Sequence, residues 1–80
     1  MKVTVTVNRR PDIADPEGTT VERALHDLGY PEVKTVRMDR VIHMEVSSED
    51  PVSVRARVEE MCRRLLANPV LEDFEVEVDG

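Results

Sequence analysis

The chain has few of the residues on which reactive or ligand-binding sites are usually built. Its 80 residues include one cysteine, three glycines and only two aromatic side chains, Tyr30 and Phe74, and no long hydrophobic run is present. A single cysteine excludes an internal disulfide. Together with the lack of a run long enough for a signal peptide or a membrane span, this predicts a reducing, cytoplasmic setting. Gly18, Gly29 and Gly80 lie too far apart for a phosphate-binding loop, so nucleotide binding by this chain alone is not expected.

Basic residues are also fewer than acidic ones. The chain has eleven lysines and arginines and 17 carboxylates, which gives a formal net charge of -6 at pH 7 and a pI of about 4.8. The summed field of such a chain repels phosphate backbones and anionic lipid. We therefore expect neither nucleic acid nor a membrane among its partners.

The candidate reactive side chains each have a structural explanation. Cys62 falls on the apolar stripe of a predicted helix, where a free cysteine is a packed core side chain. His26 and His43 fall on polar faces, and no pair of residues has the spacing of a metal site. Glu59-Glu60 falls on a solvated face rather than in an acid–base pair. The sequence thus predicts no catalytic residue, no metal and no cofactor bound by this chain.

Aliphatic residues, by contrast, are abundant, with fourteen valines among them. Apolar and polar residues alternate over 2–8, 33–38, 41–47 and 74–79, the period of a half-buried strand. The second and third of these segments are joined by a short turn at Asp39-Arg40 and are predicted to form a hairpin.

Two Asp-Pro pairs predict the starts of two helices. Asp15 and Asp50 are suited to cap the free N–H groups, and each is followed by a proline that fits the first helical position. Gly29 and Asn68 are predicted to end these helices in the left-handed conformation, and a proline follows each of them within two residues.

Each predicted helix carries one apolar stripe opposite a charged face. The stripe of the first helix consists of Val21, Ala24, Leu25 and Leu28, and that of the second of Val54, Val58, Met61, Cys62 and Leu65.

The element order is βαββαβ over a single domain, residues 1–80. This order predicts an α+β two-layer sandwich, an antiparallel four-stranded sheet with two helices on one face, as in ferredoxin-like folds. In that fold the first and third strands are central, which leaves Thr4, Thr6, Val41 and His43 on an open face. So small a domain gains stability by binding copies of itself, so we expect a homo-oligomer, a dimer or a tetramer.

Several strings, in this order and spacing, resemble the PurS family over almost the whole chain. They are Asp15-Pro16-Glu17-Gly18, Leu28-Gly29-Tyr30, Val36-Arg37, Leu65-Leu66-Ala67-Asn68-Pro69-Val70 and Glu72-Asp73-Phe74. Asp39-Arg40 departs from the family, which more often has glycine and lysine there.

The resemblance implies a PurS-like fold and a function. PurS-like chains are non-catalytic small subunits of phosphoribosylformylglycinamidine synthase, in which pairs of them bridge a glutaminase subunit and an ATP-dependent synthetase subunit. ATP, Mg and glutamine are then used by the partner subunits in a middle step of purine biosynthesis.

For partner contact we select Arg9, Tyr30, Arg37 and His43, which lie in loops or on outward faces and are able to hydrogen-bond. An equally supported interpretation is that Tyr30 only packs on the helix end and Arg37 only pairs with a neighbouring glutamate. The alternative function is an ACT-like module that senses a small molecule. Such modules usually bind their ligand beside a glycine in the first strand-to-helix loop, and Gly18 comes a few residues too late.

Overall fold

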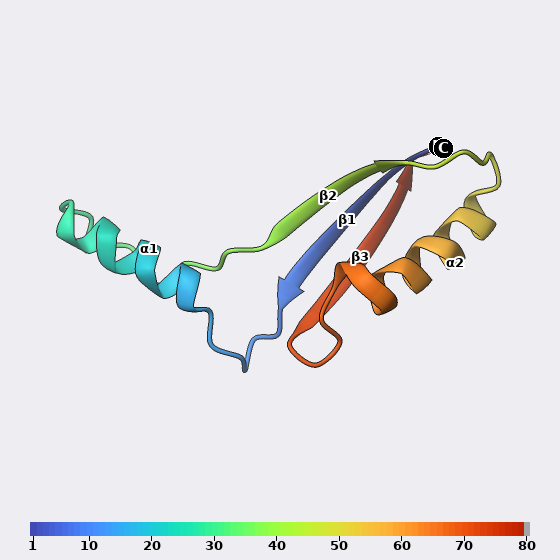
Figure 1. Cartoon of the computed structure of the whole chain (residues 1–80). Coiled ribbons are helices and arrows are strands. Elements are labelled where there is room, and N and C mark those ends of the chain that lie inside the picture. Colours follow the sequence, from blue (N-terminus) through green and yellow to red (C-terminus); the bar gives the residue numbers. More distant parts are fainter. Residues whose placement is uncertain (80) are drawn as a thin grey trace.

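The computed structural model describes residues 1–79 and consists of a packed body and a projecting arm (Figure 1). The arm contains helix α1 (Pro16–Asp27) and the extended segment 31–39, which runs back alongside it. The body contains β1 (Lys2–Arg9), β2 (Arg40–Glu45), α2 (Pro51–Met61), the π-helical turn η1 (Cys62–Leu66) that continues α2, and β3 (Glu72–Asp79).

The three strands form one antiparallel sheet in the order β2-β1-β3. The register places Val5 of β1 between Ile42 of β2 and Val76 of β3. Because side chains alternate between the two faces of a strand, this register gathers the apolar residues of all three strands on one face. The other face carries the polar residues, as the alternation in the sequence predicts.

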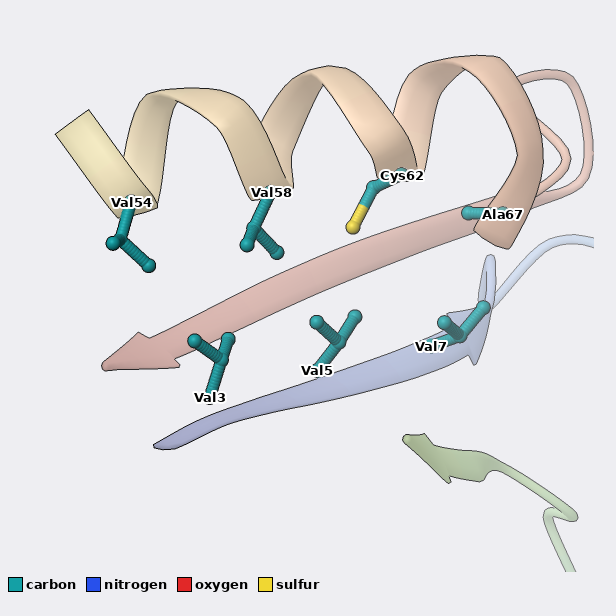
Figure 2. Close-up of a cluster of buried hydrophobic side chains, with 7 residues drawn as sticks. All are labelled: Val3, Val5, Val7, Val54, Val58, Cys62 and Ala67. Carbon is teal, nitrogen blue, oxygen red and sulfur yellow. The ribbon is translucent and has the colours of Figure 1, made fainter. Parts of the chain in front are cut away.

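The core lies between this apolar face and the α2–η1 helix (Figure 2). Its fully buried side chains come from β1 and from one side of the helix, and all of them are small. They are Val3, Val5, Val7, Val54, Val58 and Cys62, with Ala67 almost as well buried. Ile42 and Met44 of β2 are only half-buried at the margin of this core. A core of valines this small gives a domain only marginal stability, which favours association with another chain.

The π turn changes which residues of the second helix reach the core. The backbone N–H of Ala67 donates to the carbonyl of Cys62 over 3.0 Å, five residues back. This wider turn uses one more residue, so Ala67 is buried while Leu65 is 83% exposed. The predicted stripe is therefore right for Val54, Val58 and Cys62. It is wrong for Leu65 and for Met61, which is 37% exposed.

The predicted four-stranded sandwich is wrong. Residues 33–38 are extended but pair with no strand in residues 1–79, so the sheet has three strands and the predicted hairpin is absent. As a result, β1 alone is central and β2 lies at an edge. The second helix does cover the sheet, whereas α1 points away from it (Figure 1). An alternating pattern shows that a segment is extended, but it does not show whether a neighbouring strand is available.

The projecting arm makes the molecule elongated. Its principal extents are 49 × 24 × 14 Å and its radius of gyration is 16.1 Å, whereas a compact chain of this length has a radius of about 12 Å. The apolar stripe of α1 is left open: Leu28 is 73% exposed, Ala24 is exposed, and Val21 and Leu25 are half-buried. A stripe of this kind stabilises a helix only when another surface covers it.

The helix ends follow local rules, with one exception. Asp15 and Asp50 are the N-caps, and each carboxylate accepts a backbone N–H of its own first turn. Gly29 has a φ of 101° and is the only residue in 1–79 with a positive φ. The left-handed conformation predicted for Asn68 is therefore wrong. Its side-chain oxygen instead accepts the N–H of Val70 over 3.0 Å, and this contact closes the turn without a left-handed residue.

Candidate functional site

The arm is joined to the body at an elbow, formed by the loop 10–15 and residues 36–38 opposite it. Asp15 lies at its centre and is 7% exposed. Its Oδ1 accepts the N–H of Gly18 over 3.0 Å, and its Oδ2 accepts the N–H of Met38 over 2.8 Å. One carboxylate thus caps α1 and also fixes the segment that returns from the tip of the arm to the sheet.

Arg37 holds the other side of the elbow. Its Nη2 donates to the carbonyl oxygens of Arg9 and Arg10 over 2.8 and 3.1 Å, and its Nη1 lies 3.5 Å from that of Ile13. The guanidinium group therefore connects the returning segment to the end of β1 and to the loop after it. The sequence interpretation that Arg37 pairs with a neighbouring glutamate is wrong, because its partners are carbonyl groups within the chain.

Gly18 allows the returning segment of the arm to lie close against the first turn of α1. A Cβ at this position would overlap the carbonyl oxygen of Val36 and would lie 2.9 Å from Oδ2 of Asp15. Only glycine fits such a close approach of two backbones. Sequence reasoning missed this role. The available signal was a glycine inside the first turn of a helix, where alanine is otherwise the better residue.

Acid is expected to open the elbow. The N–H groups of Met38 and Gly18, with smaller contributions from Arg37 and Arg9, lower the pKa of Asp15 below its ordinary value of 3.8, against the opposing effect of burial. A lowered folded-state pKa means that the carboxylate stabilises the fold above the ordinary value, and that this stabilisation is lost as the pH falls through the lowered value. The protection of the Gly18 and Met38 amides against hydrogen exchange, taken relative to the intrinsic exchange rate at each pH, should therefore fall as the pH drops below that ordinary value.

An Asp15→Asn variant provides the control for this acid effect. Its side-chain amide accepts one N–H but turns its own NH₂ group toward the other, so both backbone amides should be weakly protected at every pH, without the acid-dependent loss of protection expected for the parent chain. Equal acid sensitivity in both proteins would show that another group opens the elbow.

The four residues selected for partner contact lie in three places. Arg9 and Arg37 meet at the elbow, where Arg37 donates to the Arg9 carbonyl. Tyr30 lies three residues after the end of α1 and is 51% exposed. His43 lies on the outer face of the sheet, opposite Thr4 of β1. The structure therefore brings two of them together and leaves Tyr30 and His43 on separate surfaces.

The outer face of the sheet has the mixed character expected from the sequence. Thr4 of β1 lies between His43 and Glu77, and the next outward-facing row along β1 places Thr6 between Val41 and Glu75. Val41 is 55% exposed on this face. The centre of the face is thus uncharged, and one edge, β3, is acidic.

No candidate metal centre is found in residues 1–79. No three His, Cys, Asp or Glu side chains in this range are grouped so that they could hold a metal ion. Burial raises the pKa of the Cys62 thiol, which points into the core. No helix in this part of the chain has both the length and the apolar character needed to cross a bilayer.

The family is decided by comparison with known proteins. The PurS family, described as phosphoribosylformylglycinamidine (FGAM) synthase, matches residues 2–80. The chain belongs to the PurS family. The resemblance drawn from the sequence strings is confirmed, and membership argues against the ACT-like alternative.

Individual PurS relatives agree with this assignment along nearly the whole chain. The phosphoribosylformylglycinamidine synthase subunit PurS of Methanocaldococcus jannaschii is 41% identical over 98% of this chain and 94% of its own length. Its crystal structure matches with a TM-score of 0.86. PurS of Bacillus subtilis matches with a TM-score of 0.90 and 38% identity, over 99% of this chain and 98% of that one. A chain in the structure of PurLQS from Thermotoga maritima matches with a TM-score of 0.84 and 37% identity, over 95% and 93% of the two chains.

Proposed function

We propose that this chain is the PurS subunit of phosphoribosylformylglycinamidine synthase and that it holds a glutaminase subunit and an ATP-dependent synthetase subunit together. The observation that carries the proposal is the family match over residues 2–80. The M. jannaschii relative is one of the subunits of formylglycinamide ribonucleotide amidotransferase in purine biosynthesis, and the T. maritima relative belongs to PurLQS.

The role that we assign to this chain is positional. ATP, Mg and glutamine are used by the partner subunits, and none of them is bound by this chain. Ammonia released by one subunit must reach the activated substrate on the other before it escapes to water. Holding the two sites in a fixed relation makes that transfer effectively intramolecular. The reducing cytoplasm expected from the sequence is part of the same proposal.

Self-association is the second part of the proposal. The stripe on α1 is uncovered, and the body has a core of small side chains with β2 at its margin. Two copies that cover each other's α1 stripes would each gain the apolar burial that one chain lacks. We therefore propose a dimer as the basic unit, or a tetramer built from two such dimers.

Mixing the three proteins tests this function. With the chain present, the glutaminase and synthetase subunits should co-elute in size-exclusion chromatography with light scattering, and glutamine should support formation of the amidine. Without the chain, glutamine-dependent turnover should fall by at least about tenfold, because ammonia is then lost to solvent. Turnover with added ammonia needs only the synthetase and should persist. Equal glutamine-dependent turnover with and without the chain would contradict the proposal.

A further inference from the structure

The backbone groups along the outer edge of β3 can be assigned from the strand register. The N–H of Arg10 donates to the carbonyl of Leu71 over 2.9 Å, so these two residues form a hydrogen-bonded pair of the β1–β3 ladder. Hydrogen-bonded and non-bonded pairs alternate along an antiparallel ladder. Counting from this pair, Val5 and Val76 fall among the non-bonded pairs. The N–H and C=O of Val76, and of every second residue of β3 on either side of it, therefore point away from β1.

Two groups of the same chain already occupy this edge. Nη1 of Arg55, in α2, donates to the Val76 carbonyl over 2.8 Å. Helix α2 lies beside β3, so the arginine reaches the edge from the helix (Figure 1). At the start of the strand, the outward N–H of Glu72 donates to the carbonyl of Asn68 over 2.8 Å. A strand arriving at β3 would have to displace these contacts.

The opposite edge of the sheet, β2, has no such cover. The N–H of Val46 donates to the carbonyl of Met1 over 2.9 Å. The same alternation therefore turns the backbone groups of Val41, His43 and Glu45 outward. No hydrogen bond from another part of residues 1–79 reaches these outward groups. The two edges thus differ, because one is occupied by the chain itself and the other is open.

The outer face of β3 is acidic, which opposes one kind of strand pairing but not another. Its exposed side chains are Asp73, Glu75, Glu77 and Asp79. If two copies paired β3 antiparallel to β3 about Val76, Glu75 of each copy would lie opposite Glu77 of the other, and like charges so placed destabilise a strand pair. The outer face of β2 carries Val41 and His43. Charge repulsion therefore does not prevent β2 of one copy from adding to β3 of the next.

We infer that Arg55 closes the β3 edge to strand addition and thereby keeps self-association of this chain finite. A sheet with two open edges can join β2 of one copy to β3 of the next, and this head-to-tail contact repeats without limit. With β3 closed, that series cannot begin. The inference goes beyond the proposed function, because it concerns contacts between copies of this chain and not the large subunits.

Arg55→Ala tests the inference, with Arg57→Ala as its matched control. Arg57 is a second exposed arginine of α2, and its replacement removes the same charge without freeing the Val76 carbonyl. Both variants should keep the circular dichroism spectrum of the parent chain, because alanine favours a helix. In sedimentation velocity, the parent chain and Arg57→Ala should keep one size. The weight-average mass of Arg55→Ala should rise at least about twofold between roughly 10 and 300 micromolar, as open-ended association requires by mass action.

Amide hydrogen exchange locates the new contact. The outward N–H groups of Val76 and Val78 should exchange fast in the parent chain. In the larger species of Arg55→Ala they should become protected by about tenfold or more, because an added strand accepts them. The N–H of Glu77, which belongs to a hydrogen-bonded pair with Thr4 of β1, should be equally protected in both proteins.

A Glu75→Thr/Glu77→Thr background separates the arginine from the acidic row. It removes the repulsion between two β3 strands and keeps the contact between Arg55 and Val76, so this double variant should keep the size of the parent chain. Adding Arg55→Ala to it should again produce larger species. If the double variant associates further while Arg55 is in place, the arginine does not close the edge and the inference is overturned.

Two other results would also overturn the inference. One is that Arg55→Ala keeps the size of the parent chain at the highest concentration, both alone and in the Glu75→Thr/Glu77→Thr background. The other is that larger species form while the amides of Val76 and Val78 still exchange fast, which would place the contact elsewhere. Neither result affects the proposed function, which is tested by assembly of the parent chain with the two large subunits.

Discussion

Leu28→Asp is expected to convert the proposed homo-oligomer into a monomer. Leu28 ends the apolar stripe of α1 and is 73% exposed in the single chain, so the substitution should not harm the fold of that chain. In the proposed dimer this side chain is covered. Replacing it loses the burial of a leucine, about 2 kcal/mol, and forces a carboxylate into an apolar contact, which costs at least as much again. Together these terms weaken association on the order of 100-fold or more.

Sedimentation velocity at micromolar concentration measures this change directly. Arg23→Asp provides the matched control, because it introduces the same side chain on the opposite, solvated face of the same helix and should leave the oligomer intact. The melting temperature offers a second check. It should rise with protein concentration for the parent chain and become independent of it for Leu28→Asp. An oligomer of unchanged size in Leu28→Asp would show that the α1 stripe is not the contact between copies.

Gly18→Ala is expected to disrupt the elbow, although the same change usually stabilises a helix by up to about 1 kcal/mol. The added Cβ would overlap the Val36 carbonyl oxygen and crowd Oδ2 of Asp15, which accepts the Met38 N–H. Either the returning segment shifts or the cap is lost. We therefore expect the free energy of unfolding to fall by about 1–3 kcal/mol, as in other overpacked sites.

The functional consequence of Gly18→Ala is expected to be a changed orientation of the arm relative to the body. Because the arm carries the stripe that we propose for self-association, a displaced elbow should reduce glutamine-dependent turnover of the assembled complex, while ammonia-dependent synthesis by the synthetase subunit stays unchanged. Thr20→Ala is the control, since Thr20 is an exposed residue of α1 whose replacement by alanine crowds nothing. Urea unfolding and the two turnover assays measure both effects. If Gly18→Ala stabilises the chain as an ordinary helical alanine would, the assignment of Gly18 to a close backbone approach is wrong.

The predictions that were confirmed depend on contacts between residues close in the sequence. Both helix starts lie at the Asp-Pro pairs, because a capping carboxylate binds N–H groups only two or three residues away. The alternating valines of β1 face the core as expected, because neighbouring side chains of a strand must point to opposite faces. The strings that resemble PurS are likewise properties of the sequence itself, so the family can be inferred from the residues alone.

The predictions that failed depend on contacts between distant residues. The segment 33–38 has the pattern of a strand, yet Asp15 accepts the N–H of Met38 and Gly18 leaves room for the Val36 carbonyl, so the segment lies against α1 instead of pairing with the sheet. Leu65 has the spacing of a core residue, yet the π turn exposes it. Arg37 was expected, in one interpretation, to pair with a neighbouring glutamate, while its guanidinium group binds three carbonyls 24 to 28 residues earlier in the chain.

By itself, the sequence determined where the helices begin, which strand faces are apolar, and the family, because caps, side-chain alternation and motif spacing are local properties. Only the tertiary structure decided that the sheet has three strands, that α1 extends as an arm, and which apolar side chains remain uncovered. The reason is that strand pairing and side-chain burial depend on residues far away in the sequence. A periodic pattern predicts which face of an element is apolar, but not which surface will cover it.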